Sequence, residues 1–138
     1  MRAGRSSGRF VRYQLPAVVW ALAIFAGSSL PGKAFPEVGF ALVDKAAHVL
    51  EFAVLSFLLS RAFTRSSNAP RRGRAWLWAA LSGTAWAVSD EVHQFFVPGR
   101  LTSSYDLMAD TVGVAVGLVT YALLHAKATP TAEQTSED

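Results

Sequence analysis

A dense group of ionisable side chains interrupts the third long apolar stretch of this chain. Two adjacent carboxylates, Asp90 and Glu91, are followed by His93 and by the amide of Gln94. The stretch is long enough to cross a bilayer, and each charge near the centre of a membrane helix costs roughly 2.5–3.5 kcal/mol on insertion scales. Because a chain does not carry that cost by default, we expect the function to depend on this group.

The residue types in this group suit two kinds of role. Asp90, Glu91 and Gln94 could act as an acid–base pair with a positioning amide. They could equally form a buried hydrogen-bond network that fixes the position of the helix. Two carboxylates at depth cannot both ionise cheaply unless a cation lies close, and Lys45 and Arg100 are the available cations. The structural alternative is therefore an ion network linking Lys45, Asp90 and Arg100.

Two of the three histidines could also be ligands of a metal ion. His48 and Glu51 are three residues apart, a spacing found at metal sites in helical bundles. His93 and Asp106 could complete a set of nitrogen and oxygen ligands. Lys45 would place an ammonium beside that set, however, and His93 projects roughly 60–100° away from the carboxylate pair. From the sequence we therefore expect no metal and no cofactor.

Four apolar stretches are long enough to position these residues within a bilayer. They predict membrane helices over residues 13–30, 45–63, 75–96 and 106–125. The chain has 138 residues, 51% of them hydrophobic, and a mean hydropathy of +0.28, which is too apolar for an ordinary soluble domain. A soluble bundle would need a charged outer face on every helix, and residues 18–25 and 112–124 have none. The predicted fold is an all-α, four-helix transmembrane bundle.

Arginines predict the topology of this bundle. They precede the first helix and join the second to the third: Arg2, Arg5, Arg9 and Arg12, then Arg61, Arg65, Arg71, Arg72 and Arg74. The positive-inside rule makes both stretches cytoplasmic, so both termini are expected in the cytoplasm of a multi-pass cell-membrane protein. This distribution explains the net charge of +3 without nucleic-acid binding.

The two ends of the sequence predict the limits of the membrane domain, and the cysteine content restricts its chemistry. Residues 1–9 and 126–138 are polar and are expected to be disordered, which leaves a membrane domain at 10–125. The sequence contains no cysteine, which excludes disulfides, thiolate metal sites and a cysteine nucleophile.

Helical periodicity gathers the polar residues onto one face of each of three helices. These faces carry Asp44, Lys45, His48 and Glu51; Asp90, Glu91 and Gln94; and Asp106, Asp110, Gly113 and Gly117. The two glycines form a small-xxx-small pair that allows close helix approach. With the predicted topology, all three polar ends lie at the extracytoplasmic side. We therefore expect one polar pocket in the outer leaflet, covered by the loop that carries Arg100 and Ser104.

The same motifs resemble those of the VanZ-like family of bacterial membrane proteins. The matching residues are Asp44-Lys45-x-x-His48-x-x-x-Phe52, Asp90-Glu91-x-x-Gln94-x-Phe96-x-Pro98-Gly99-Arg100 and Ser104-x-Asp106-x-x-x-Asp110-x-x-Gly113, together with Ser28-Ser29-Leu30-Pro31. The resemblance covers most of the chain between about residues 25 and 117, and it implies an integral protein of the cell envelope. The founding member of the family is associated with resistance to the glycopeptide teicoplanin. The chain departs from the family at Asp110, where the family usually has asparagine.

Three functions are compatible with this pocket. The leading hypothesis is binding of an anionic or amphiphilic ligand, either a lipid headgroup or a lipoglycopeptide, which would extend to glycopeptide resistance. The candidate ligand-binding residues are Lys45, His48, Glu51, Asp90, Glu91, Gln94, Arg100, Ser104, Asp106 and Asp110. The expected partners are membrane lipids, a lipid-linked cell-wall precursor or a glycopeptide antibiotic.

The first alternative is an intramembrane hydrolase or group transferase that acts on a lipid-linked substrate. Asp90 or Glu91 would then be the general base and His48 its partner. The second alternative is ion- or proton-coupled transport, which suits the carboxylates but lacks a second polar cluster in the cytoplasmic half. The residues leave open whether any reaction is catalysed.

Overall fold

The computed structural model describes residues 7–31, 40–65, 72–100 and 103–126, and every regular element in these ranges is helical. A short π-helix, η1, leads into α2, and three long helices follow. Their bounds are η1 Phe10–Gln14, α2 Leu15–Ser28, α3 Phe40–Arg65, α4 Arg72–Phe95 and α5 Ser104–Ala126. The all-α prediction is confirmed for this part of the chain, and each of the four predicted apolar helices has a counterpart.

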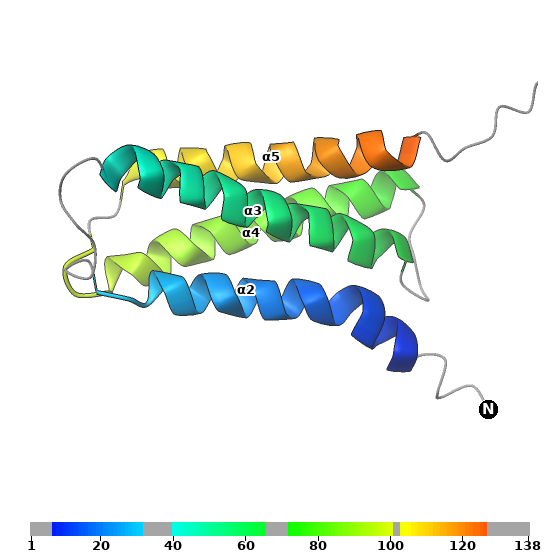
Figure 1. Ribbon diagram of the computed structural model, residues 1–138, viewed down its shortest axis with the longest axis horizontal. Helices are drawn as coiled ribbons and strands as arrows, with labels where there is room; N and C mark the ends of the chain where they lie inside the picture. The colour runs from blue at the N-terminus through cyan, green and yellow to red at the C-terminus, as the bar shows by residue number, and fades with distance from the viewer. Residues whose placement is uncertain (1–6, 32–39, 66–71, 101–102, 127–138) are drawn as a thin grey trace, which may run out of the picture.

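Successive long helices run in opposite directions and form an up-and-down bundle (Figure 1). α2 and α4 end at the left of Figure 1, where α3 and α5 begin. The starts of α2 and α4 lie at the right, together with the ends of α3 and α5. Residues that are far apart in sequence, at the start of α3, the end of α4 and the start of α5, therefore meet at one end of the bundle.

α3 and α5 pack closely because glycines remove side chains from their contact. A Cβ atom at Gly113 would lie 2.5 Å from the carbonyl oxygen of Val49, and one at Gly117 would collide with the carbonyl oxygen of Ala53. The close approach predicted from the Gly113–Gly117 spacing is therefore confirmed. A hydrogen bond of 2.8 Å from Ser56 Oγ to the Val114 carbonyl joins the same two helices.

The apolar core lies midway along the bundle and contains residues from all four long helices. It comprises Ile24, Phe52, Leu55, Ala79, Ala87, Val114 and Leu118. α2 is attached to α3 by a hydrogen bond of 2.9 Å from Trp20 Nε1 to the Glu51 carbonyl oxygen. Packing in this core fixes the rotation of each helix about its own axis, and that rotation determines which side chains of the polar faces meet.

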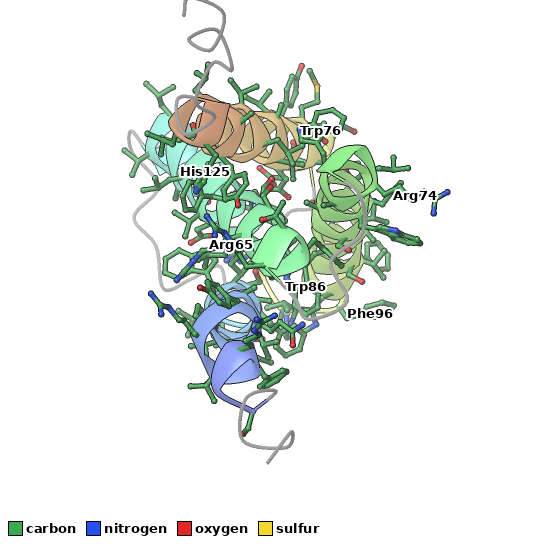
Figure 2. The ribbon with its side chains drawn as sticks, turned by 90° about the vertical axis from the view of Figure 1, so that its right-hand side faces the viewer. Arg65, Arg74, Trp76, Trp86, Phe96 and His125 are labelled. Atoms are coloured by element: carbon green, nitrogen blue, oxygen red, sulfur yellow. The ribbon has the colours of Figure 1, made fainter. Side chains whose placement is uncertain are left out.

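Many large apolar side chains are exposed on the outer surface of the bundle. Figure 2 views the bundle and its side chains end-on. Among the described residues, two helices are long and apolar enough to cross a membrane, at Ser7–Ser28 and Ser104–His125. The first of these extends into the segment 1–9 that was expected to be disordered. Residues 1–6 and 127–138, and with them most of both predicted tails, lie outside the described residues.

Candidate functional site

The polar face of α3 lies near the beginning of that helix. Asp44, Lys45 and Glu51 are half-buried, and His48 is buried. This face turns towards α5, because two of its side chains bond to carboxylates there. The inward direction that periodicity predicted for these residues is therefore the one observed.

The ammonium group of Lys45 joins carboxylates from two helices. Its Nζ atom donates to Asp44 Oδ2 at 3.0 Å and to Asp106 Oδ1. The Asp106 side chain is only 5% exposed, whereas that of Lys45 is 31% exposed. Lys45 therefore compensates the charge of a carboxylate that is almost removed from solvent.

A second link between α3 and α5 lies one helical turn further along both helices. His48 Nδ1 and Asp110 Oδ1 are 2.8 Å apart, and both side chains are buried. A carboxylate in this position orients the imidazole ring and favours the form of the ring that donates a hydrogen bond from Nδ1. The partner of His48 is thus Asp110, and neither Asp90 nor Glu91 takes that position.

α4 contributes Asp90 and Gln94, which are one turn apart and almost fully buried. Gln94 Nε2 donates to Asp90 Oδ2 at 2.7 Å. Asp90 approaches the other two helices, since it can offer an oxygen within 4.8 Å of ligand atoms from both His48 and Asp110. The neighbouring Glu91 is half-buried and interacts electrostatically with both Asp106 and Asp110.

We refer to the polar side chains at this end of the bundle as the polar cluster. Its members are Asp44, Lys45, His48, Glu51, Asp90, Glu91, Gln94, Arg100, Asp106 and Asp110. Glu51 belongs to it because its carboxylate interacts electrostatically with His48 and Asp90. The structure therefore brings together every candidate ligand-binding residue except Ser104.

Arg100 lies at the edge of the polar cluster, in the turn that follows α4. The turn is closed by a 3.2 Å bond from the Arg100 amide to the Val97 carbonyl, and Gly99 adopts a positive φ of 76°, which glycine tolerates without strain. The guanidinium group donates to the carbonyls of Gly27 and Leu30 at 3.4 Å each. Its Nη1 atom is also 4.0 Å from Asp44 Oδ1. Arg100 thus connects the end of α2 to the acidic side chains.

Two serines at the start of α5 differ in their surroundings. Ser104 is exposed at the first residue of the helix. Ser103 accepts a 3.2 Å hydrogen bond from the Tyr105 amide at its Oγ, and its carbonyl accepts one of 2.7 Å from the Asp106 amide. Ser103 is therefore the N-cap that fixes where Asp106 enters the polar cluster. A serine directly before a helical segment is a sequence signal for this role, and our candidate residues did not include it.

His93 lies on the side of α4 that faces α2, away from the polar cluster. Its Nε2 atom is 2.9 Å from Ser29 Oγ, and its ring centroid is 4.2 Å from that of Phe25. Ser29 also donates to the Phe25 carbonyl at 2.7 Å. His93 therefore helps to hold the end of α2 against α4, and it does not join His48.

Within the described residues, two sets of side chains could hold a metal ion. They are Asp44, His48 and Asp106, and His48, Asp90 and Asp110. In each set the potential ligand atoms lie within 4.8 Å of one another. Neither set contains Glu51 or His93, which the sequence spacing had suggested as ligands.

The helical fold, the two helices long and apolar enough to span a bilayer and the apolar outer surface indicate a membrane protein. A family model described as VanZ/LLP1 matches residues 5–125. The chain belongs to this VanZ/LLP1 family, as the motifs of the polar cluster predicted. Searches of curated proteins and of solved structures found no match.

Proposed function

We propose that this protein spans the cell membrane four times and binds an anionic or amphiphilic ligand at its polar cluster. In this proposal both termini are cytoplasmic, and the polar cluster lies in the outer leaflet. The ligand is the headgroup of a lipid or of a lipid-linked molecule, or a lipoglycopeptide. If the ligand is a glycopeptide antibiotic, binding would extend to the resistance associated with the founding member of the family.

Among the described residues, two helices are long and apolar enough to cross a membrane, and the outer surfaces of α3 and α4 support two further spans. α3 and α4 have 26 and 24 residues, enough to cross a bilayer. Their exposed surfaces carry large apolar side chains: Leu42, Val43, Leu50, Trp76, Leu77, Trp78, Leu81, Val88, Val92 and Phe95. Several of their charged residues belong to the polar cluster, where they need not face lipid. An apolar surface of this extent is unusual for a soluble monomer.

The distribution of basic residues supports the proposed orientation. Arg65 and Arg74 lie at the end of the bundle that faces the viewer in Figure 2, with His125 at the same end. The polar cluster lies at the opposite end, where α3 and α5 begin (Figure 1). Because arginines mark the cytoplasmic side of a membrane protein, this separation favours an extracytoplasmic polar cluster.

The ligand-binding proposal rests on one observation: the Lys45 side chain of the polar cluster is more exposed than the carboxylates of Asp90, Asp106 and Asp110. Lys45 is at the rim, with its side chain 31% exposed, while Asp106, Asp90 and Asp110 are each less than 5% exposed as residues. Arg100 lies at the end of α2, and its side chain is 14% exposed. An anionic headgroup that enters from the outer leaflet would meet the Lys45 ammonium before these three carboxylates, and the guanidinium group of Arg100 suits phosphate or carboxylate recognition.

Lipid retention tests this proposal directly. The full chain is reconstituted in nanodiscs with equal amounts of phosphatidylglycerol and phosphatidylcholine, and native mass spectrometry identifies the lipids that stay bound after release. We expect preferential retention of phosphatidylglycerol, reduced in Lys45→Gln and Arg100→Gln. Arg74→Gln is the matched control, because Arg74 is an exposed arginine at the opposite end. Equal retention of both lipids by the folded wild-type protein would refute anionic headgroup binding.

The contact between His48 and Asp110 favours a second candidate, an intramembrane hydrolase or group transferase. An imidazole oriented by a buried carboxylate at 2.8 Å is an arrangement that general acid–base catalysis uses. The acid–base pair would then be His48 and Asp110, with Asp90 beside it. Turnover of a lipid-linked substrate in proteoliposomes, abolished in His48→Gln, would favour this enzyme over a simple binding protein.

A further inference from the structure

The innermost part of the polar cluster is formed by one side chain from each of three helices. His48 of α3, Asp90 of α4 and Asp110 of α5 are 6%, 3% and 1% exposed, and their potential ligand atoms lie within 4.8 Å of one another. We refer to these three residues as the inner triad. It combines two carboxylates with a single imidazole in a place where uncompensated negative charge is costly.

Several oxygen atoms in and beside the inner triad lack a hydrogen-bond partner among the described residues. They are Asp90 Oδ1, Asp110 Oδ2 and Gln94 Oε1. Gln94 is 1% exposed, and its Nε2 atom donates a hydrogen bond to Asp90 Oδ2. The Oε1 atom of the same amide therefore lies close to the inner triad. All three atoms are acceptors, and a buried acceptor without a partner costs about 1–3 kcal/mol. A single cation placed among them could satisfy all three together.

In the outer part of the polar cluster, a positively charged side chain already compensates two carboxylates. Asp44, His48 and Asp106 have a similar spacing, and the ammonium group of Lys45 bonds to both carboxylates of that set. A side-chain cation thus already lies between Asp44 and Asp106. For the inner triad, the ion pair observed is that of His48 with Asp110, a single imidazole beside two carboxylates.

We propose that the inner triad binds one divalent metal ion, with His48, Asp90 and Asp110 as ligands and Gln94 Oε1 as a fourth. Two ligands at about 2.1 Å from a metal lie roughly 3.0–3.4 Å apart for octahedral or tetrahedral angles. The 2.8 Å between His48 Nδ1 and Asp110 Oδ1 therefore needs little adjustment. The proton shared by these two atoms would leave when the metal binds.

The ligand set also limits the metal. One imidazole nitrogen with carboxylate and amide oxygens is a borderline to hard donor set, which suits Zn²⁺ or Mn²⁺ and disfavours the softer Cu⁺. The positive charge of the ion would offset both buried carboxylates. This inference goes beyond the proposed ligand binding and does not depend on it, because it concerns atoms deeper than Lys45 and Arg100.

Calorimetric titration of the full chain in detergent tests the metal site. The protein is first treated with a chelator and then titrated with ZnCl₂ or MnCl₂. We expect saturable binding of about one ion per chain. Asp90→Asn and Asp110→Asn should weaken binding by more than about 100-fold, and Gln94→Met by roughly 10–100-fold.

Two control variants separate the inner triad from its surroundings. Asp44→Asn changes the carboxylate that Lys45 already neutralises, and His93→Gln changes a histidine that contacts α2. Both should bind the ion as the wild-type protein does. Weaker binding in Asp44→Asn together with unchanged binding in Asp110→Asn would move the ion to the outer set and overturn the proposal.

The spectrum of bound Mn²⁺ gives an independent measurement on the wild-type protein, which remains informative if a variant fails to fold. Electron spin-echo spectroscopy should detect a coupled nitrogen from His48, and the coupling should persist in His93→Gln. Absence of saturable binding of either ion by the folded wild-type protein, judged by circular dichroism and gel filtration, would overturn the proposal. So would bound Mn²⁺ without nitrogen coupling.

Discussion

At the scale of single residues, the polar cluster is a set of acidic groups whose charges are compensated unequally. Lys45 donates hydrogen bonds to the carboxylates of Asp44 and Asp106. The hydrogen bond observed for the Asp90 side chain comes from the neutral amide of Gln94. A hydrogen bond from a neutral amide supplies no opposite charge to a buried carboxylate. We therefore expect the members of the cluster to respond differently to substitution.

Lys45→Met should destabilise the protein, because it leaves the buried carboxylate of Asp106 without its cation. We expect a loss of about 1–3 kcal/mol in the free energy of unfolding, limited by the 31% exposure of the Lys45 side chain. Thermal unfolding in detergent measures the change. The double variant Lys45→Met/Asp106→Asn should recover part of the loss, since the second substitution removes the charge. Equal stability of the single variant and the wild-type protein would contradict the ion network.

Sequence periodicity predicted which residues would enter the polar cluster, but it did not predict how they would pair. The spacing of Asp44, Lys45, His48 and Glu51 is enough to place them on one helical face. The choice of Asp110 as the partner of His48 depends on the rotation of α5 about its axis. That rotation follows from packing between helices, which the pattern of one helix does not contain.

At the scale of the elements, the contact between α3 and α5 determines the geometry of the polar cluster. Gly113 and Gly117 let the backbones approach, and two links of the polar cluster, Lys45 to Asp106 and His48 to Asp110, join the same pair of helices. A wider separation of α3 and α5 would stretch both links together. Packing in the core and charge pairing at the end are therefore coupled.

Gly117→Ala should disrupt this contact, because its Cβ would collide with the Ala53 carbonyl oxygen of α3. Backbone cannot move aside as a flexible side chain can, so we expect a loss of about 1–3 kcal/mol or more in unfolding free energy. The matched control is Gly27→Ala in α2, where a Cβ meets nothing within 4 Å. Gly27→Ala should be neutral or slightly stabilising, by about 0.5–1 kcal/mol. Similar melting temperatures for the two variants would contradict the close packing.

Apolar length predicted the helices well, and their ends less well. α5 begins at Ser104, within two residues of its predicted start, whereas α3 begins at Phe40, five residues before the predicted Lys45. The residues that the prediction missed, 40–44, are apolar except for Asp44, and they extend α3 by more than one turn before Lys45. A turn with glycine at a positive φ, such as that at Gly99, is consistent with the Pro98-Gly99 signal in the sequence.

At the scale of the whole molecule, the separation of arginines and polar cluster predicts the orientation in the membrane. The chain has no native cysteine, so single-cysteine variants report accessibility without background. Tyr105 is 71% exposed beside the polar cluster, and Ser7 is exposed at the other end. In intact cells, a membrane-impermeant thiol reagent should label Tyr105→Cys and spare Ser7→Cys. The opposite pattern would reverse the topology and move the polar cluster to the cytoplasmic side.

The sequence predicted the class of fold and the meeting of three polar faces, because both follow from apolar length and period. It did not predict that Arg100 would bond to carbonyls at the end of α2. Nor did it predict the deep set of His48, Asp90 and Asp110. Both features depend on how loops and helices pack across the bundle, and packing of this kind is set by many weak contacts together.

A crystal structure grown from a lipid mesophase that contains phosphatidylglycerol would test most directly whether the polar cluster binds a headgroup. We predict electron density for a headgroup phosphate beside Lys45 and Arg100, at the end of the bundle where α3 and α5 begin, with the acyl chains along the apolar surface. A Lys45→Gln/Arg100→Gln variant crystallised in the same way should lack that density. Ordered phosphatidylglycerol headgroups found only at the end that carries Arg65 and Arg74 would contradict the proposed function.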